Sequence, residues 1–551
     1  MKSSSFPPPA AEVVPRQAVR DPDLWLKAVA WVTIIACALL ILTFSFGRDQ
    51  SIYAVVGDGL LRGQVPYKDL WDFKPPGIFY VYSLAQALFG KNMMAPRLLE
   101  VLALFGSVAA MRRFSNQVFE DRTVGLLGGA IAALIHAEMD FWHTGQPETF
   151  GALFTLLGLM LTLEESKRRW LIPLGVGLCF GCAALLKPPL GGGALVCAAY
   201  LAQRARGVLA GRAAVWPMLK PVAWVALGGA LPALLCVAWF VAKGAYHDFY
   251  WTLGEFTPGY TKLGWEGRRA SDMLYYAIEE AFFKFSALAA AGVVSAVAIQ
   301  PVGQREREGL FLILGVIAIH VAGIAMQGKF FPYHYGATLP LIALLAGLGL
   351  YKLWKRCLFG GMGGPLAFFS FVAVCVPMRY AVRDLPQFFW ERAQIRFSYL
   401  LRIPPYDSRE AMDRELSYVA DYNLSADRAV ALEVRSHTSS HDSVFVWGFE
   451  PAVYWLAERE PSSRFIYNVA QRSPWEAKYA RTELMRDLKR NTPKMLVVQT
   501  RDVFPAVTGN VFDSRDSIPG FPEFDEFLSS KYVFRRRIED FDIYALAQTT
   551  R

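Results

Sequence analysis

The sequence predicts a polytopic α-helical membrane protein that ends in a small soluble α/β domain. Apolar runs long enough to cross about 30 Å of hydrocarbon recur from Leu24 to Met378. Of the 551 residues, 54% are hydrophobic and only 19% are charged, whereas soluble domains usually carry about a quarter charged residues. The mean hydropathy is +0.26. Beyond Arg379 the composition changes to that of a soluble domain.

The apolar runs predict about eleven transmembrane helices. Residues 1–23 are rich in Pro, Ser and Ala and are expected to form a disordered cytoplasmic tail. The run from Pro75 to Phe89 is short and begins with two prolines, so we expect an interfacial or re-entrant helix there. The predicted spans are centred near Ala36, Leu104, Ile131, Leu156, Gly177, Leu195, Gly229, Ala291, Gly315, Leu345 and Val372.

Positive charge falls in alternate loops. By the positive-inside rule these loops are cytoplasmic, which places the N-terminus inside and the other loops outside. The odd number of spans also places the C-terminal region outside. The basic loops contain Arg112 and Arg113; Lys167, Arg168 and Arg169; Arg204, Arg206 and Arg212; Arg305 and Arg307; and Lys352, Lys355 and Arg356.

We expect residues 24–380 to form the membrane domain and residues 381–551 a periplasmic α/β domain. Buried strands are predicted at Asp442–Gly448 and Lys494–Gln499, because both runs are short, apolar and rich in β-branched residues. Between them, Glu476–Lys489 has helical spacing, and Pro474 is placed to open that helix. The seven cysteines all lie in or beside apolar segments, so no disulfide framework is expected.

The first external loop holds the most informative residues. Asp49 follows the first span, and a carboxylate there suits either proton abstraction from a hydroxyl or simple solvation at a helix end. Farther along, Asp72 and Lys74 stand beside Trp71, and two prolines fix the backbone directly after the lysine. Such a cluster suits a phosphate, with a divalent ion between phosphate and carboxylate, or it is an ordinary polar loop.

Three segments carry a family resemblance. Asp49 to Ala54 followed by Asp72-Phe-Lys-Pro-Pro76 resembles the start of the GT-C glycosyltransferases, in particular the bacterial relatives of protein O-mannosyltransferases and of the lipid A aminoarabinose transferase. Gln327 to Tyr335 is similar to the late external loop of that family. Val444 to Gly448, with the residues up to Phe465, resembles its periplasmic domain.

The resemblance implies a membrane enzyme that transfers a sugar from a polyprenyl-phosphate donor with inversion. Asp49 would be the general base that activates the acceptor hydroxyl. The phosphate leaving group is stable as an anion and needs positive charge, which Lys74, Lys187 and Lys329 would supply. Glu148 and Tyr333 are placed among the donor or phosphate-binding residues.

Several of these assignments have alternatives. Glu148 lies where relatives carry an acid, but an acid at the start of a helix is also favoured by the helix dipole. His143 and His334 suit a metal or a phosphate, although a single histidine in a loop usually does neither. The possible divalent ion would be held by Asp72 and His334.

The distribution of charge along the chain argues against other functions. A transporter or lipid flippase places ionisable residues near the bilayer midplane, whereas here the spans are nearly free of charge and the acids and lysines gather at one face. A scaffold protein would leave Asp49 and Lys74 unexplained, and nucleic-acid binding is not indicated. We expect a bacterial inner-membrane protein whose active site faces the periplasm; its acceptor is a lipid, glycan or protein, and the sequence identifies neither the sugar nor the acceptor.

Overall fold

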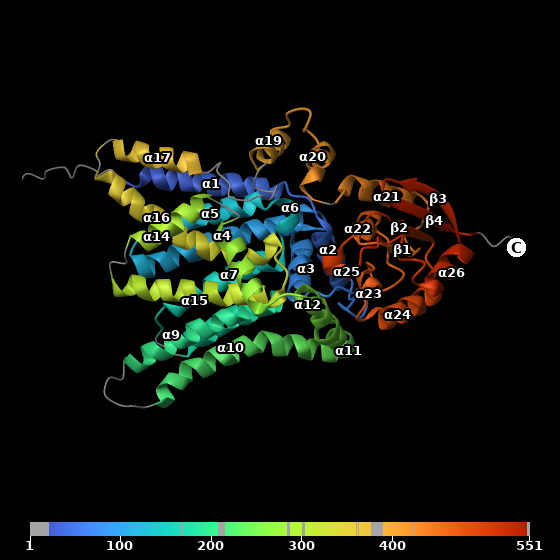
Figure 1. Ribbon diagram of the computed structural model, residues 1–551, viewed down its shortest axis with the longest axis horizontal. Helices are drawn as coiled ribbons and strands as arrows, with labels where there is room; N and C mark the ends of the chain where they lie inside the picture. Colours follow the sequence, from blue (N-terminus) through green and yellow to red (C-terminus); the bar gives the residue numbers. More distant parts are fainter. Residues whose placement is uncertain are drawn as a thin grey trace, which may run out of the picture.

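The computed structural model describes residues 21–166, 168, 170–207, 215–283, 287–299, 303–359, 361, 363–375, 389–420 and 422–547. An elongated helical domain forms one end of the molecule and a smaller α/β domain forms the other (Figure 1). Residues 1–20 of the tail predicted at residues 1–23, and the predicted domain boundary at residues 380 and 381, lie outside the described residues.

The helical domain contains the following elements: α1 Leu24–Leu42, α2 Arg48–Leu61, α3 Gly77–Phe89, α4 Met94–Phe119, α5 Arg122–Glu138, α6 Asp140–His143, α7 Pro147–Thr162, α8 Leu171–Leu186, η1 Pro188–Gly192, α9 Gly193–Gly207, α10 Val215–Ala242, α11 Tyr246–Tyr250, the π-helix η2 Trp251–Phe256, α12 Thr257–Trp265, α13 Ala270–Phe283, α14 Ala287–Ala298, α15 Gln304–Gln327, η3 Pro332–Tyr335, α16 Leu339–Leu358 and α17 Gly363–Cys375.

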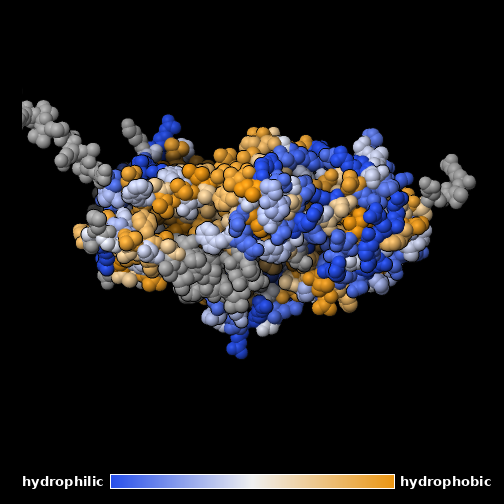
Figure 2. Space-filling view, turned by 90° about the horizontal axis from the view of Figure 1, so that it is seen from above, coloured by the Kyte–Doolittle hydropathy of each residue, from blue (hydrophilic) through white to orange (hydrophobic). Residues whose placement is uncertain are grey.

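Each of the predicted span centres lies within a helix. By length and composition, four helical segments among the described residues are long and apolar enough to cross a membrane: α1, α4, Met218–Ala242 of α10, and α15. Others, such as α7 and α8, are shorter, so the number of spans stays a prediction. On the face shown in Figure 2, apolar side chains gather on the helical domain, and hydrophilic ones are more frequent over the α/β domain.

Close helix contacts depend on small residues. A Cβ atom on Gly177 of α8 would collide with the backbone of α10 at Val225, and one on Gly128 of α5 would lie 2.8 Å from the Cα of Leu344 in α16. Small residues let membrane helices approach closely enough for dispersion contacts to stabilise the bundle. Cys179 and Cys182, on α8, are free and partly buried.

The basic loops meet at the end of the helical domain away from the α/β domain (Figure 1). Arg113 pairs with Glu164 at 2.7 Å, Arg204 with Glu165 at 2.7 Å, and Arg305 with Glu120 at 3.1 Å. These pairs join segments that are far apart in sequence. The basic loops that alternate along the chain therefore lie together at one end of the bundle. Lys167, Arg169 and Arg212 of these loops lie outside the described residues.

The α/β domain is built on a four-stranded sheet of order β1-β2-β4-β3. β1 and β2 are parallel, with Val444 opposite Met495, and the remaining pairs are antiparallel. Both predicted strands and the predicted helix, which is α24, are confirmed. The elements are α19 Phe389–Leu400, α20 Arg409–Glu415, η4 Leu416–Val419, α21 Leu424–Ser436, β1 Val444–Trp447, α22 Ala452–Ala457, α23 Val469–Arg472, α24 Ala477–Arg490, β2 Met495–Gln499, α25 Pro505–Thr508, α26 Pro522–Lys531, β3 Tyr532–Ile538 and β4 Phe541–Leu546.

The two domains share one buried core. The loop before α3 reaches the α/β domain, where the Trp71 amide donates to the Arg464 carbonyl at 2.7 Å. The Trp71 ring is fully buried and lies 5.5 Å from that of Phe465 and 5.4 Å from that of Tyr467. Helices α2, α3 and α12 lie at this junction (Figure 1). The external-loop residues of the predicted site therefore meet where the domains join.

Candidate active site

Asp49 lies in the first turn of α2. The helix begins at Arg48 after Gly47, whose extended backbone caps it, and the amide of Gly47 donates to the side chain of Gln50. The Asp49 carboxylate accepts a hydrogen bond from Gln146 Nε2 at 3.1 Å. Gln146 is itself held by the Tyr53 hydroxyl, which donates to its Oε1 at 2.9 Å. Asp49 is therefore oriented but keeps 23% of its side-chain surface exposed.

Lys74 faces Asp49 from the loop before α3. Its Nζ lies 3.7 Å from the Asp49 carboxylate and donates to the Tyr333 hydroxyl at 3.5 Å. The same Nζ stands 5.0 Å from the centroid of the Tyr333 ring. Pro75 and Pro76 fix the backbone that carries the lysine directly into α3. A base, a cation and a phenol thus converge at one point.

A second acid and lysine complete the cluster. Glu148 lies in the first turn of α7, and Lys187 ends α8 just before the prolines of η1. Their charged groups are 2.8 Å apart, and Lys187 Nζ lies 6.0 Å from the Tyr333 ring centroid. Gly336 packs against Glu148 closely enough that a Cβ atom there would lie 3.2 Å from the Glu148 Cβ.

The ionisation of the lysines follows from this arrangement. Burial lowers the pKa of Lys74, but the carboxylates of Asp49 and Glu148 outweigh that effect and hold the pKa above its ordinary value. Burial, together with the nearby charge of Lys74, lowers the pKa of Lys187. Burial also raises the pKa of the Tyr333 phenol well above its ordinary value, so this hydroxyl remains a hydrogen-bond donor. An anion bound at this cluster would therefore contact two cations and one neutral hydrogen-bond donor.

Asp72 is placed behind this cluster. It is buried, and its Oδ1 accepts hydrogen bonds from the Tyr467 hydroxyl at 2.5 Å and the Phe73 amide at 2.8 Å. Its Oδ2 is buried without a hydrogen-bond partner. Burial raises the pKa of Asp72 to about 6, against the opposing effects of Tyr467 and Lys74. Asp72 therefore acts on the cluster through its electrostatic interaction with Lys74.

The late loop contributes Tyr333 to the cluster, while Lys329 lies at the border with the α/β domain. Lys329 Nζ donates to the Ala506 carbonyl at 2.6 Å and stands 4.4 Å from the Tyr260 ring centroid. Burial, with a contribution from Arg268, lowers its pKa to about 8. His334 Nδ1 lies 2.7 Å from the Lys329 carbonyl, and burial lowers the pKa of this histidine well below its ordinary value.

Comparison with known proteins identifies the architecture. Residues 73–240 match the family described as dolichyl-phosphate-mannose-protein mannosyltransferase. The structure of ArnT from Cupriavidus metallidurans bound to undecaprenyl phosphate is similar to this chain, with a TM-score of 0.54 and 14% identity over 96% of this chain and 99% of that chain. This chain has the GT-C glycosyltransferase fold. ArnT from the same organism in the apo state matches at a TM-score of 0.55 and 14% identity, over 95% of this chain and 97% of that chain. No curated protein sequence matches.

The resemblance to the GT-C enzymes expected from the sequence is therefore confirmed, as is a multi-pass membrane protein of that type. Within the GT-C fold, the structure brings together five of the predicted site residues, Asp49, Lys74, Glu148, Lys187 and Tyr333. The family match begins at Phe73 and includes three of them, Lys74, Glu148 and Lys187.

The two predicted metal ligands offer a partial fit to a divalent ion. Asp72 has one buried oxygen without a hydrogen-bond partner, and His334 uses its Nδ1 on the Lys329 carbonyl. Among the residues that the structure describes, no three His, Cys, Asp or Glu side chains lie close enough together to hold a metal ion. The divalent ion stays a prediction.

A buried ion pair supports the site and was missed from the sequence. Arg97 and Glu100 on α4 pair at 2.7 Å and are almost fully buried. Glu100 Oε1 accepts the Gly145 amide at 2.8 Å, and Arg97 reaches the Thr144 hydroxyl at 3.1 Å. These contacts fix the loop that delivers Gln146 to Asp49. The expectation that the spans are nearly free of charge is wrong here, and two charged residues in one apolar run were the signal.

Neutralising Asp72 is expected to alter the pH profile of activity at this site. Because the carboxyl titrates near pH 6, wild-type kcat/KM should fall as the pH drops through about 6 and Lys74 loses its ionised neighbour. Asp72→Asn should lack that inflection and be about 10-fold less active at pH 8. A pKa raised by folding means that ionised Asp72 costs stability above pH 6, so the Tm of the variant at pH 8 should equal or exceed that of wild type. If the inflection near pH 6 is unchanged in Asp72→Asn, Asp72 is not the group that causes it.

Proposed function

We propose that this protein is a membrane glycosyltransferase that moves a sugar from a polyprenyl-phosphate donor to an acceptor hydroxyl with inversion. The observation that carries the proposal is the approach of the Asp49 carboxylate to Lys74 Nζ, at 3.7 Å, beside Tyr333. It joins a partly exposed base to a group that binds phosphate. Transfer from a phosphate-linked sugar requires both.

In this mechanism Asp49 takes the proton of the acceptor hydroxyl while the hydroxyl oxygen attacks the anomeric carbon. The bond from that carbon to the phosphate oxygen breaks on the opposite face, which inverts the anomeric centre. The electron pair leaves with the polyprenyl phosphate, and the proton ends on Asp49. Gln146 orients the carboxylate for this transfer.

The leaving phosphate gains negative charge as the glycosidic bond breaks. Lys74 supplies the nearest cation, and Lys187 stands at the other side of Tyr333, whose hydroxyl is a neutral donor. Charge-assisted hydrogen bonds in a water-poor site stabilise such charge strongly. Glu148 holds Lys187 and contributes to binding of the donor. Lys329 is assigned to the donor headgroup at the border with the α/β domain.

The donor class is supported by ArnT of the same fold, which is described bound to undecaprenyl phosphate. The acceptor is a lipid, glycan or protein. Its entry is from the side of the α/β domain, because α2, which carries Asp49, lies at that junction (Figure 1). We place the protein in the bacterial inner membrane with this end in the periplasm, since the basic loops gather at the opposite end.

The proposal is tested with a panel of radiolabelled polyprenyl phosphates that carry hexoses, pentoses or amino sugars. Membranes that contain the protein should release free polyprenyl phosphate and form a labelled product with at least one donor, whereas matched membranes without the protein should not. A transporter or lipid flippase, the alternative, would move an intact lipid-linked sugar across proteoliposomes without cleaving it. Translocation without cleavage would overturn the proposal.

A further inference from the structure

The first turn of α2 carries a buried arginine directly before Asp49. Arg48 donates from Nε and Nη2 to one carboxylate oxygen of Glu450, at 3.0 and 2.6 Å. Both residues are at most 5% exposed. Glu450 belongs to the α/β domain, so this ion pair joins the base-bearing helix to the second domain. A buried pair with this geometry is costly to break, because one charge would remain without its partner.

Aromatic side chains enclose the arginine. The guanidinium carbon lies 4.4 Å from the ring centroid of Phe504, 5.3 Å from Phe449, 5.4 Å from Trp142 and 5.9 Å from Tyr422. Three of these rings come from the α/β domain. Cations over ring faces are attracted by the ring quadrupole, more strongly when water is excluded. The arginine is thus held in one place from several directions.

Glu450 is itself fixed by the sheet. β1 ends at Trp447, and a Cβ on the following Gly448 would lie 2.6 Å from the Cβ of Gln499 at the end of β2. This close approach lets Gln499 accept from the Phe449 amide at 2.7 Å and donate to Glu450 Oε1 at 3.1 Å. The segment Val444 to Gly448, singled out in the sequence, therefore delivers Glu450 to Arg48.

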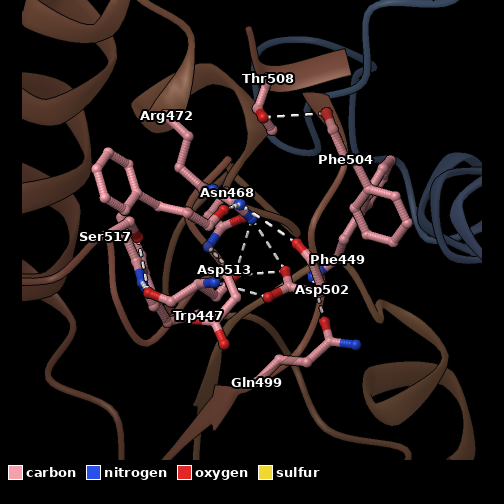
Figure 3. A network of polar contacts seen from close by, with 12 residues as sticks. Trp447, Phe449, Asn468, Arg472, Gln499, Asp502, Phe504, Thr508, Asp513 and Ser517 are labelled. Atoms are coloured by element: carbon pink, nitrogen blue, oxygen red, sulfur yellow. Dashed lines mark hydrogen bonds and ion pairs between the residues drawn. The ribbon is translucent and has the colours of Figure 1, made fainter. Parts of the chain in front are cut away.

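Phe504 is held by a polar network of the α/β domain (Figure 3). Asp502 accepts from Arg472 Nη1 at 3.0 Å and from the Ser514 amide at 2.6 Å. The Thr508 hydroxyl donates to the Phe504 carbonyl at 3.0 Å. The same segment supplies the Ala506 carbonyl that binds Lys329. One loop of the α/β domain thus contacts both Arg48 and Lys329.

We propose that Glu450 is a positioning residue, which sets the Asp49 carboxylate for proton abstraction by holding Arg48 and with it the first turn of α2. This inference rests on the proposed function for its catalytic consequence. The α/β domain then contributes to chemistry through a defined contact, in addition to any part in acceptor binding. Glu450 and Arg48 act through Asp49 and do not themselves contact the reacting atoms.

The test compares Glu450→Gln with Glu460→Gln in the full-length protein in lipid nanodiscs. Glu460 is a matched control, because it pairs with Arg62 at the other end of α2 and also joins the two domains, but both side chains are exposed. Glutamine at 450 can still accept hydrogen bonds from Arg48 and Gln499, yet it removes the charge. We expect kcat to fall about 10- to 100-fold with KM changed less than 3-fold, since small displacements of a reacting group cost rate. Glu460→Gln should leave both unchanged.

Hydrogen exchange of residues 47–55 provides a readout that does not depend on the reaction. Glu450→Gln should speed exchange there at least 5-fold, while α24 stays as protected as in wild type. An active wild type with unchanged kcat in Glu450→Gln overturns the inference. If wild type cleaves no donor, the proposed function fails, and exchange alone decides: faster exchange in residues 47–55 supports the anchoring role, and unchanged exchange rejects it.

A second variant covers the case in which Glu450→Gln does not fold. Arg48→Met/Glu450→Met replaces the pair by apolar side chains of similar volume, a change that buried ion pairs often tolerate. We expect this variant to fold and still to lose kcat as the single variant does, because the contact that places Asp49 is gone. Wild-type kcat in the folded double variant would overturn the inference.

Discussion

Asp49→Asn is expected to lower kcat by about 10³-fold, the range for loss of a general base. The asparagine keeps an oxygen that can accept the hydrogen bond from Gln146, so the local structure should survive. What is lost is the capacity to take the acceptor proton. The measurement is the initial rate of sugar transfer from the donor that wild type uses, at equal protein levels in membranes.

The matched control for this variant lies on the same helix. Asp58→Asn removes an acid near the end of α2, where it pairs with Lys91 at 2.9 Å and with Arg62 at 3.3 Å. Transfer by Asp58→Asn should stay within 2-fold of wild type. If Asp49→Asn transfers sugar as fast as this control, Asp49 is not the base.

Lys74→Met is expected to lower kcat/KM by about 10²- to 10³-fold, because a charged donor to the departing phosphate is removed. It should also weaken binding of undecaprenyl phosphate, the leaving group without its sugar, by at least 10-fold. Asp49→Asn should bind that lipid as well as wild type or better, since a negative charge near the phosphate is gone. The two variants therefore distinguish the role of the general base from the role of the phosphate-binding lysine.

Lys68→Met is the control for the lysine. Lys68 lies six residues earlier in the same loop, is exposed, and donates to the Lys243 carbonyl at 3.3 Å. Its replacement should leave undecaprenyl phosphate binding unchanged. Equal binding by Lys74→Met and Lys68→Met would remove Lys74 from the phosphate site. Thermal unfolding of each variant excludes loss of structure as the cause.

Much of the fold could be predicted from sequence patterns, because a buried strand or a helix in the hydrocarbon of a membrane requires apolar residues. Long apolar runs located the helices, and short β-branched runs located β1 and β2. The number of membrane crossings did not follow, because helices such as α8, at 16 residues, are shorter than the roughly 20 residues that usually cross a membrane. The helix at Gly77–Phe89 was expected to be short, and it is, because Pro75 and Pro76 precede it.

The sequence indicated the charged residues of the candidate site, but not the residues that hold them in place. Asp49 and Lys74 became candidates because acids and lysines cluster in the first external loop, and the resemblance to the GT-C enzymes added Lys187. Glu450 lies 402 positions from Arg48 in sequence, so only the folded chain reveals their contact. Gln146 was passed over because an amide in a loop carries no chemical signature of its own. Arg97 and Glu100 were visible as two charged residues in one apolar run, but their role appears only in the hydrogen bonds to residues 144 and 145.

The anomeric configuration of the product tests the central claim most directly. NMR of the transferred sugar, made from a donor of known linkage, reports whether the configuration changes at the anomeric carbon. With Asp49 as a base that activates the acceptor for direct attack, the product should have the opposite configuration to the donor. A product with retained configuration would contradict the account, since it requires two successive displacements and a sugar held on the enzyme between them.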